Sequence, residues 1–337
     1  LELIDQTRLE ASEERTEALA TRAWAEAVAG SVEDAERLID QLSAETPSSS
    51  DWRVFDIAHA RALTLMRRGR FVESYGPSIA AGAASDRIGR PDLAYSAWIN
   101  AAGAATAAGQ HERALELLDR AMAAVDGRGL KGIEVDVLAA QAFVLRRLGR
   151  LDDARRVADA EQAVAELLAQ PAVLAKASHD RGLVAVEQGD WELAARLLAA
   201  SLTDEAPVSR PVTRIALAEA LARGGHPEQA TEQVRATVLE PVRPSDFPQT
   251  LVPRLTRVQG LIARARGEPD EAERRLEESI AGWERLQAAD LRADSMAGVL
   301  ADLGRPVVGL VEPERELARA RADLHTIREE RGSAVVS

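Results

Sequence analysis

Small, apolar and polar residues recur along the chain with helical spacing, and glycine interrupts the pattern at regular intervals. The segment EQGDWELAARLLAASL, residues 187–202, shows one such interval. Gly189 is followed by the aromatic Trp191, by Ala194 and by the small residue Ser201. Spacings of three, four and seven residues place side chains on one face of a helix. The segment therefore predicts a tight turn followed by a helix.

The same skeleton, Gly-x-x-x-x-[Ala/Ser], occurs seven times. The pairs are Gly30/Ala35, Gly69/Ser74, Gly109/Ala114, Gly149/Ala154, Gly189/Ala194, Gly225/Ala230 and Gly267/Ala272. Successive glycines are 39, 40, 40, 40, 36 and 42 residues apart. A fixed period of this size is typical of a solenoid.

A second register supports the first, because a small residue stands seven positions before each glycine. These residues are Ala23, Ala62, Ala102, Ala142, Gly182, Ala218 and Gly260. Each unit is interpreted as a helix A, a turn in which glycine adopts the left-handed conformation, and a helix B. The small residue on helix A and the Ala or Ser on helix B then mark the place where the two helices touch.

This pattern resembles the tetratricopeptide repeat (TPR) over about residues 15–290. The closest matches are Trp98–Ala102, Gly182, Trp191–Ala194–Ser201 and Gly260. The usual TPR period is 34 residues, so the period of about 40 implies longer helices. That variant resembles the TPR-like domain of large bacterial transcription regulators of the MalT/LuxR type. The resemblance implies an all-α fold, a right-handed superhelix (α-solenoid) of about eight antiparallel helix hairpins.

The predicted organisation is one continuous superhelical domain. Residues 1–289 form seven TPR-like hairpins, 290–331 an atypical capping hairpin and 332–337 a frayed tail. The capping hairpin has a helix at 290–303 and a charged final helix at 313–331. Loops rich in Pro and Ser at 46–51, 205–211 and 240–249 leave the repeat phase intact. The chain starts at Leu1 and not at Met, which suggests a processed chain, or one cut from a longer polypeptide.

Composition narrows the class of protein. Of the 337 residues, 46% are hydrophobic but only 3% aromatic, which suits closely packed Ala- and Leu-rich helices and disfavours a sheet. The absence of Cys excludes disulfides and thiolate metal sites. A net charge of −13 argues against direct nucleic-acid contact. With no long apolar run and no signal peptide, we expect no membrane span and a cytoplasmic location.

Catalytic and cofactor motifs are missing from the sequence. It contains no phosphate-binding G-x-x-x-x-G-K-[ST], no G-x-S-x-G and no H-E-x-x-H. Asp56 and His59 form an i, i+3 pair, which we interpret as a polar pair on a helix surface and not as metal ligands. We therefore predict no enzyme, no cofactor and no metal site.

The TPR resemblance implies that helix A lines the inner groove, at positions 13, 10, 6 and 3 residues before each turn glycine. The earlier repeats then supply mainly apolar residues and the later ones basic residues. Arginines suit an acidic peptide or another carboxylate ligand. The alternatives are that the arginines form a solvated face and that Trp24 and Phe143 belong to the core. The candidate groove residues are Trp24, His59, Leu63, Met66, Phe143, Arg146, Lys176, His179, Arg254, Arg257 and Arg264.

Three functions remain open on the sequence. The first is a scaffold for protein–protein interaction, such as the sensory or effector-binding arm of a bacterial transcriptional or signalling regulator. It would bind a peptide or protein, possibly acidic, in its groove. The second is a receptor domain for an acidic amphiphilic metabolite. The third, an enzyme, would need a pocket of titratable groups that the sequence does not nominate.

Overall fold

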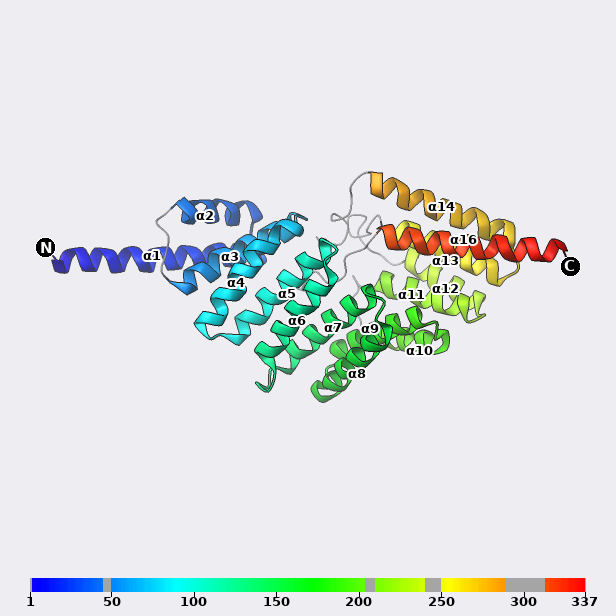
Figure 1. Cartoon of the computed structure of the whole chain (residues 1–337), viewed down its shortest axis with the longest axis horizontal. Coiled ribbons are helices and arrows are strands. Elements are labelled where there is room, and N and C mark those ends of the chain that lie inside the picture. The colour runs from blue at the N-terminus through cyan, green and yellow to red at the C-terminus, as the bar shows by residue number, and fades with distance from the viewer. Residues whose placement is uncertain (1, 45–49, 204–209, 240–249, 289–312, 337) are drawn as a thin grey trace. The chain divides into compact units, whose positions relative to one another are not determined.

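A computed structural model describes residues 2–44, 50–203, 210–239, 250–288 and 313–336. Within these ranges the regular structure consists of fifteen α-helices and one short 3-10 helix, and no strand occurs there (Figure 1). The predicted all-α fold is confirmed. The predicted helix at 290–303 and most of the three predicted loops lie outside the described ranges.

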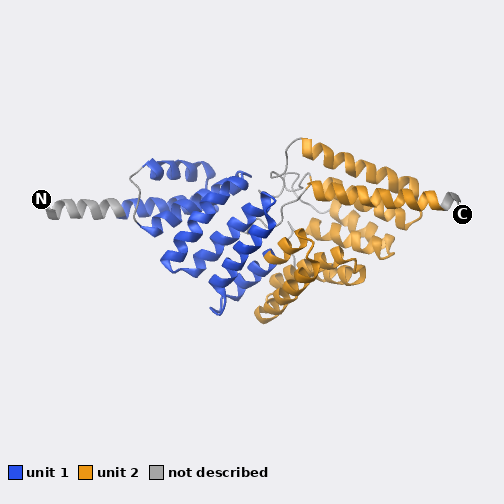
Figure 2. Ribbon diagram, viewed as in Figure 1, with its two compact units in different colours: residues 1–140, 300–308 blue, residues 141–299, 309–337 orange. Residues whose placement is uncertain are grey.

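The described chain separates into two compact units (Figure 2), each described here by itself. In unit 1, residues 1–140, three antiparallel hairpins pair α1 with α2, α3 with α4, and α5 with α6. The helices of this unit are α1 (Glu2–Ala29), α2 (Val32–Ala44), α3 (Asp51–Arg67), η1 (Val72–Ser74), α4 (Tyr75–Ile88), α5 (Pro91–Ala107), α6 (His111–Val125) and the first part of α7 (Lys131–Arg147).

Unit 2 comprises residues 141–288 and 313–336 of the described chain. The pairs α9–α10, α11–α12 and α13–α14 form its hairpins, and α16 packs against α14. Its further helices are α8 (Leu151–Leu168), α9 (Pro171–Gln188), α10 (Trp191–Ser201), α11 (Arg210–Arg223), α12 (Pro227–Leu239), α13 (Leu251–Ala265), α14 (Pro269–Ala288) and α16 (Pro313–Val336).

The glycine turn is confirmed at six of the seven predicted positions. Each of these glycines has a positive φ between 71° and 82°, a conformation that costs glycine little. The first turn is built differently, because Gly30 is not left-handed. There the Gly30 amide donates to the carbonyl of Glu26 at 3.0 Å, and Ser31 Oγ accepts from the Asp34 amide at 3.2 Å at the start of α2.

The small residues on helix A also lie where the two helices of a hairpin touch. A Cβ atom at Gly182 would lie 2.7 Å from Leu198 Cγ on α10. At Gly260 it would lie 2.9 Å from Leu276 Cγ on α14. The five alanines in this register are at most 2% exposed. Helix A and helix B therefore approach closely because no larger side chain separates them.

Helix α16 follows α14 in the way that a helix A follows the preceding helix B. Its apolar face buries Leu317, Ala320, Leu324 and Ile327. Leu324 and Ile327 belong to the cluster that contains Leu276 of α14, and Leu317 belongs to the cluster that contains Trp283.

The helix is also longer than the sequence predicted. Residues 332–336, expected as a frayed tail, continue α16 to Val336. Ser333 Oγ donates to the carbonyl of Glu329 at 3.0 Å, one turn back in the helix. Among the described helices, none is long and apolar enough to cross a membrane.

We expect Gly182→Trp to lower the free energy of unfolding by roughly 1–3 kcal/mol or more, because the indole must displace Leu198 from a closed contact. Urea unfolding followed by circular dichroism measures the change. The matched control is Gly132→Trp near the start of α7, where a Cβ meets nothing within 4 Å. Equal effects at the two positions would contradict the close helix contact.

Candidate binding site in the second unit

Three arginines of α13 pair with three carboxylates of α16. Arg254 Nη2 donates to Glu316 Oε1 at 3.0 Å, and Arg257 Nε donates to Asp323 Oδ2 at 2.7 Å. Arg264 Nε donates to Glu330 Oε2 at 3.0 Å. The three carboxylates are seven residues apart and so lie on one face of α16. Arg254, Arg257 and Arg264, predicted as part of a basic stripe, are therefore each paired with a carboxylate of α16.

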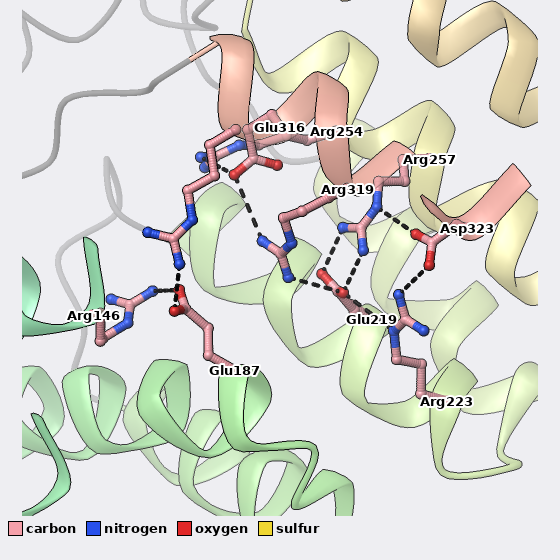
Figure 3. A network of polar contacts seen from close by, with 10 residues as sticks. Arg146, Glu187, Glu219, Arg223, Arg254, Arg257, Glu316, Arg319 and Asp323 are labelled. Carbon is pink, nitrogen blue, oxygen red and sulfur yellow. Dashed lines mark hydrogen bonds and ion pairs between the residues drawn. The ribbon is translucent and has the colours of Figure 1, made fainter. Parts of the chain in front are cut away.

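Arg257 is the centre of this arrangement (Figure 3) and is only 3% exposed. Besides Asp323, it contacts Glu219 of α11 in a bidentate pair, with N–O distances of 3.0 and 2.7 Å. Glu219 also accepts from Arg319 at 3.1 Å and from Arg223 at 3.3 Å. Asp323 accepts from Arg223 at 2.6 Å. The buried guanidinium of Arg257 is thus paired with two carboxylates. Such pairing is expected, because an unpaired charge is costly to bury.

The pKa values of the carboxylates reflect this pairing. Burial by itself would raise the pKa of Glu219, but Arg257, Arg319 and Arg223 lower it well below its ordinary value. Burial also opposes ionisation of Glu316, yet Arg254, Arg319 and Arg257 lower its pKa to about 2. Both groups are therefore ionised at neutral pH.

A second cluster continues the network toward the start of unit 2. Glu187 of α9 accepts from Arg146 of α7 at 2.7 Å and from Arg315 of α16 at 2.6 Å. Burial opposes ionisation here too, but Arg146 and Arg315 lower the pKa of Glu187. Arg319 Nη1 lies 3.6 Å from Glu316, which joins this end of α16 to the centre of the network. The network thus links α7, α9, α11, α13 and α16.

A pocket of about 420 Å³ opens beside the network, within unit 2. Arg223, Arg315 and Arg319 keep 20–30% of their side chains exposed there, whereas Glu187, Glu219 and Asp323 keep only 7–10%. The charge that a ligand meets in this pocket is therefore positive. The lining residues are Gly149, Leu151, Val186, Glu187, Trp191, Glu219, Arg223, Arg257, Arg315, Arg319, Ala322 and Asp323.

Of the candidate residues in unit 1, Trp24 lies near His59. The His59 ring lies 5.0 Å from the Phe55 ring and 6.4 Å from the Trp24 ring, between centroids. Trp24 and Leu63 are partly buried against the same apolar cluster, and Met66 is 5% exposed. The prediction that Asp56 and His59 form a surface pair is wrong, because His59 is only 4% exposed. The physical reason is that α3 turns His59 toward the neighbouring helices, where Asn100 Nδ2 lies 3.3 Å from its Nε2.

Burial perturbs both titratable groups on this part of α3. It lowers the pKa of His59 to about 4. It raises the pKa of Asp56 to about 6, in part opposed by a hydrogen bond from Thr21 Oγ1 at 3.4 Å. The described residues hold no group of three or more His, Cys, Asp or Glu side chains arranged to bind a metal.

The remaining candidate residues of unit 2 have partners of their own. Lys176 Nζ lies 3.3 Å from Glu161 and 3.7 Å from Asp180. His179 Nδ1 lies 2.8 Å from Thr213 Oγ1. The Arg147 guanidinium stacks 4.7 Å above the Phe143 ring. Of the predicted residues, Arg146, Arg254 and Arg257 thus belong to the network. Lys176, His179 and Phe143 do not.

Sequence reasoning missed the contribution of α16. Arg315, Glu316, Arg319 and Asp323 lie in a segment interpreted only as a charged final helix. A signal was present, because carboxylates at 316, 323 and 330 repeat every seven residues and Arg315 and Arg319 are one turn apart. Their partners, however, are more than 60 residues away in the sequence.

We expect Arg257→Met to lower the free energy of unfolding by about 3–5 kcal/mol, because it leaves two buried carboxylates short of a counter-charge. The control is Arg264→Met, which breaks a more exposed pair between the same two helices and should cost about 1 kcal/mol or less. Chemical denaturation at neutral pH measures both variants. A loss at Arg257 no larger than that at Arg264 would show that the buried network does not stabilise the fold.

We also expect the change in stability caused by Asp56→Asn to depend on pH. The substitution should be more favourable for stability at pH 8 than at pH 4. The folded-state pKa of Asp56 is raised to about 6, so its favourable contribution is present at low pH and is lost as the pH rises through 6. Melting temperatures across pH 4–8 test this. As a control, Asp92→Asn should show the opposite trend, because Arg90 lowers the pKa of Asp92.

The tetratricopeptide repeat family profile matches residues 135–160, 211–236 and 253–278. Each match begins in a helix A (α7, α11 or α13) and ends in the helix B that follows it. Among curated proteins, none matches the sequence.

Several solved structures share the fold at low sequence identity. A Rap protein complexed with competence and sporulation factor has a TM-score of 0.57 and 10% identity, over 91% of this chain and 84% of that one. A tetratricopeptide repeat protein from Parabacteroides merdae has a TM-score of 0.57 and 13% identity, over 86% and 99%. The Rap conjugation gene regulator of plasmid pLS20, in complex with a Phr peptide, has a TM-score of 0.52 and 14% identity, over 94% and 96%. The chain therefore contains tetratricopeptide repeats, arranged as an α-solenoid.

Proposed function

We propose that the chain is a TPR-type interaction module that binds an acidic segment of a peptide or protein on the A-helix face of unit 2. This face is defined by α9, α11, α13 and α16. The observation that carries the proposal is the charge that a partner would meet. In a chain with a net charge of −13, the exposed charges around the pocket are the guanidinium groups of Arg223, Arg315 and Arg319.

The arrangement of helices favours recognition of an extended partner over catalysis. The ionic groups of the network come from successive A helices and from α16, so they follow the stacking direction of the repeats. Solenoids use such extended surfaces for binding. Non-enzymatic function and a cytoplasmic location remain parts of this proposal.

The regulatory setting of this module is also part of the proposal. One structural neighbour is named as a conjugation gene regulator in complex with a peptide. By analogy of fold, we propose that this chain is the sensory or effector-binding arm of a bacterial regulator. The resemblance to MalT/LuxR-type regulators belongs to the same hypothesis.

A small-molecule receptor is the second candidate, and one observation favours it. A volume of about 420 Å³ falls in the range of sites for metabolites, and the lining combines apolar side chains with a few charged groups. An acidic amphiphilic metabolite would suit such a lining. The two candidates differ in how much of the protein surface the ligand contacts. A metabolite would contact one pocket, and a peptide would contact several A helices.

Peptide selection followed by hydrogen exchange tests the proposal. Peptides selected by phage display should be rich in Asp and Glu, and their binding should slow exchange in α9, α11, α13 and α16 more than in α10 and α12. As a control, the same peptide with Asn and Gln in place of its acids should bind at least tenfold more weakly. Binding confined to the B helices, or selection of peptides without acids, would refute the proposal.

A further inference from the structure

The network in unit 2 carries more positive than negative charge. Its ten residues comprise six arginines and four carboxylates, so two positive charges are in excess (Figure 3). Four arginines and three carboxylates of this network line the pocket, so one of the two excess charges lies there, where Arg223, Arg315 and Arg319 are more exposed than the carboxylates. In a chain of net charge −13, a partly buried cluster of positive sign favours a bound anion.

Hydrogen-bond donors are in excess as well. Glu187 accepts from both Arg146 and Arg315, and Glu219 accepts from three arginines. Even so, Nη1 of Arg315, a residue of the pocket lining, is buried and has no acceptor among the described residues. Buried N–H groups ordinarily have a partner, so this donor is open to an acceptor such as a bound anion or a water molecule.

The walls of the pocket indicate which kind of anion fits. Leu151, Val186 and Trp191 line it beside the arginines. The Trp191 ring also holds the Arg223 guanidinium, which lies 5.3 Å from its centroid. An organic carboxylate fits such a site better than a bare inorganic ion, because its carbon chain can contact the apolar wall while two guanidinium groups hold its oxygens.

We propose that this pocket is a carboxylate-binding site in which Arg315 and Arg319 make the primary contacts and Arg223 a supporting one. The two primary arginines are one turn apart on α16, whereas most of the other lining residues belong to the repeats. The site therefore forms only when α16 is docked on the repeats. The ligand is a carboxylate of a bound acidic peptide or of a small free acid. The peptide case rests on the proposed function, whereas the small-acid case does not.

Titration calorimetry with two probes tests the site. The first probe is citrate, and the second is a peptide of alternating Glu and Ala residues; the matching Gln–Ala peptide is the control ligand. Arg315→Gln and Arg319→Gln are the test variants. Neither substitution leaves a carboxylate without an arginine. In Arg315→Gln, Glu187 still pairs with Arg146, and in Arg319→Gln, Glu219 still pairs with Arg257 and Arg223. Arg321→Gln is the control variant. Arg321 lies on the other side of α16, is 58% exposed and pairs with Glu284 of α14.

We expect the wild-type chain to bind at least one of the two probes. Each test variant should weaken that binding at least tenfold, Arg321→Gln less than twofold, and added NaCl should weaken it further. Thermal unfolding of each variant confirms that the fold is intact. If one test variant does not fold, the other decides the result.

The outcomes separate this site from the proposed function. Citrate binding that needs Arg315 or Arg319, without peptide binding, supports the site and counts against the peptide module. Glu–Ala peptide binding that is lost in the variants supports both. Peptide binding that is unchanged in both variants overturns the site and leaves the peptide module standing. If neither probe binds, the site is overturned.

Discussion

The burial of one guanidinium group constrains most of unit 2. Arg257 is 3% exposed, and a charge removed from water is tolerated only when paired and hydrogen-bonded. Glu219 of α11 and Asp323 of α16 supply that pairing. Three helices, one of them more than 60 residues away in the sequence, must therefore meet at a single point. The surrounding arginines then follow, since each of these carboxylates has a further arginine beside it.

This constraint explains the two different faces of α16. One face is apolar and packs on α14 through Leu317, Ala320, Leu324 and Ile327. The other carries charges that match those of α9, α11 and α13. The two faces agree on one position of the helix, in which the carboxylates meet the arginines of α13 and the apolar side chains pack on α14.

The same arrangement turns an extended surface into a pocket. A solenoid usually offers a long open face, and here the last helix closes part of it in unit 2. Because Glu187, Glu219 and Asp323 are less exposed than Arg223, Arg315 and Arg319, the network presents positive charge at the pocket. In the proposed binding mode, Arg315 and Arg319 therefore take the place of Arg254, Arg257 and Arg264 as the contacts for an acidic partner.

The repeat itself was determined by the sequence. Left-handed turns favour glycine and close helix contacts favour Ala or Gly, so local rules of backbone and packing placed six turns and the small residues correctly. Local rules failed where a partner lies far along the chain. They could not show that Arg257 is buried and paired, that His59 faces inward, or that Arg315 and Arg319 line a pocket. Only the tertiary structure decided these points, because burial and ion pairing depend on which helices meet in space, and periodicity along one helix does not contain that information.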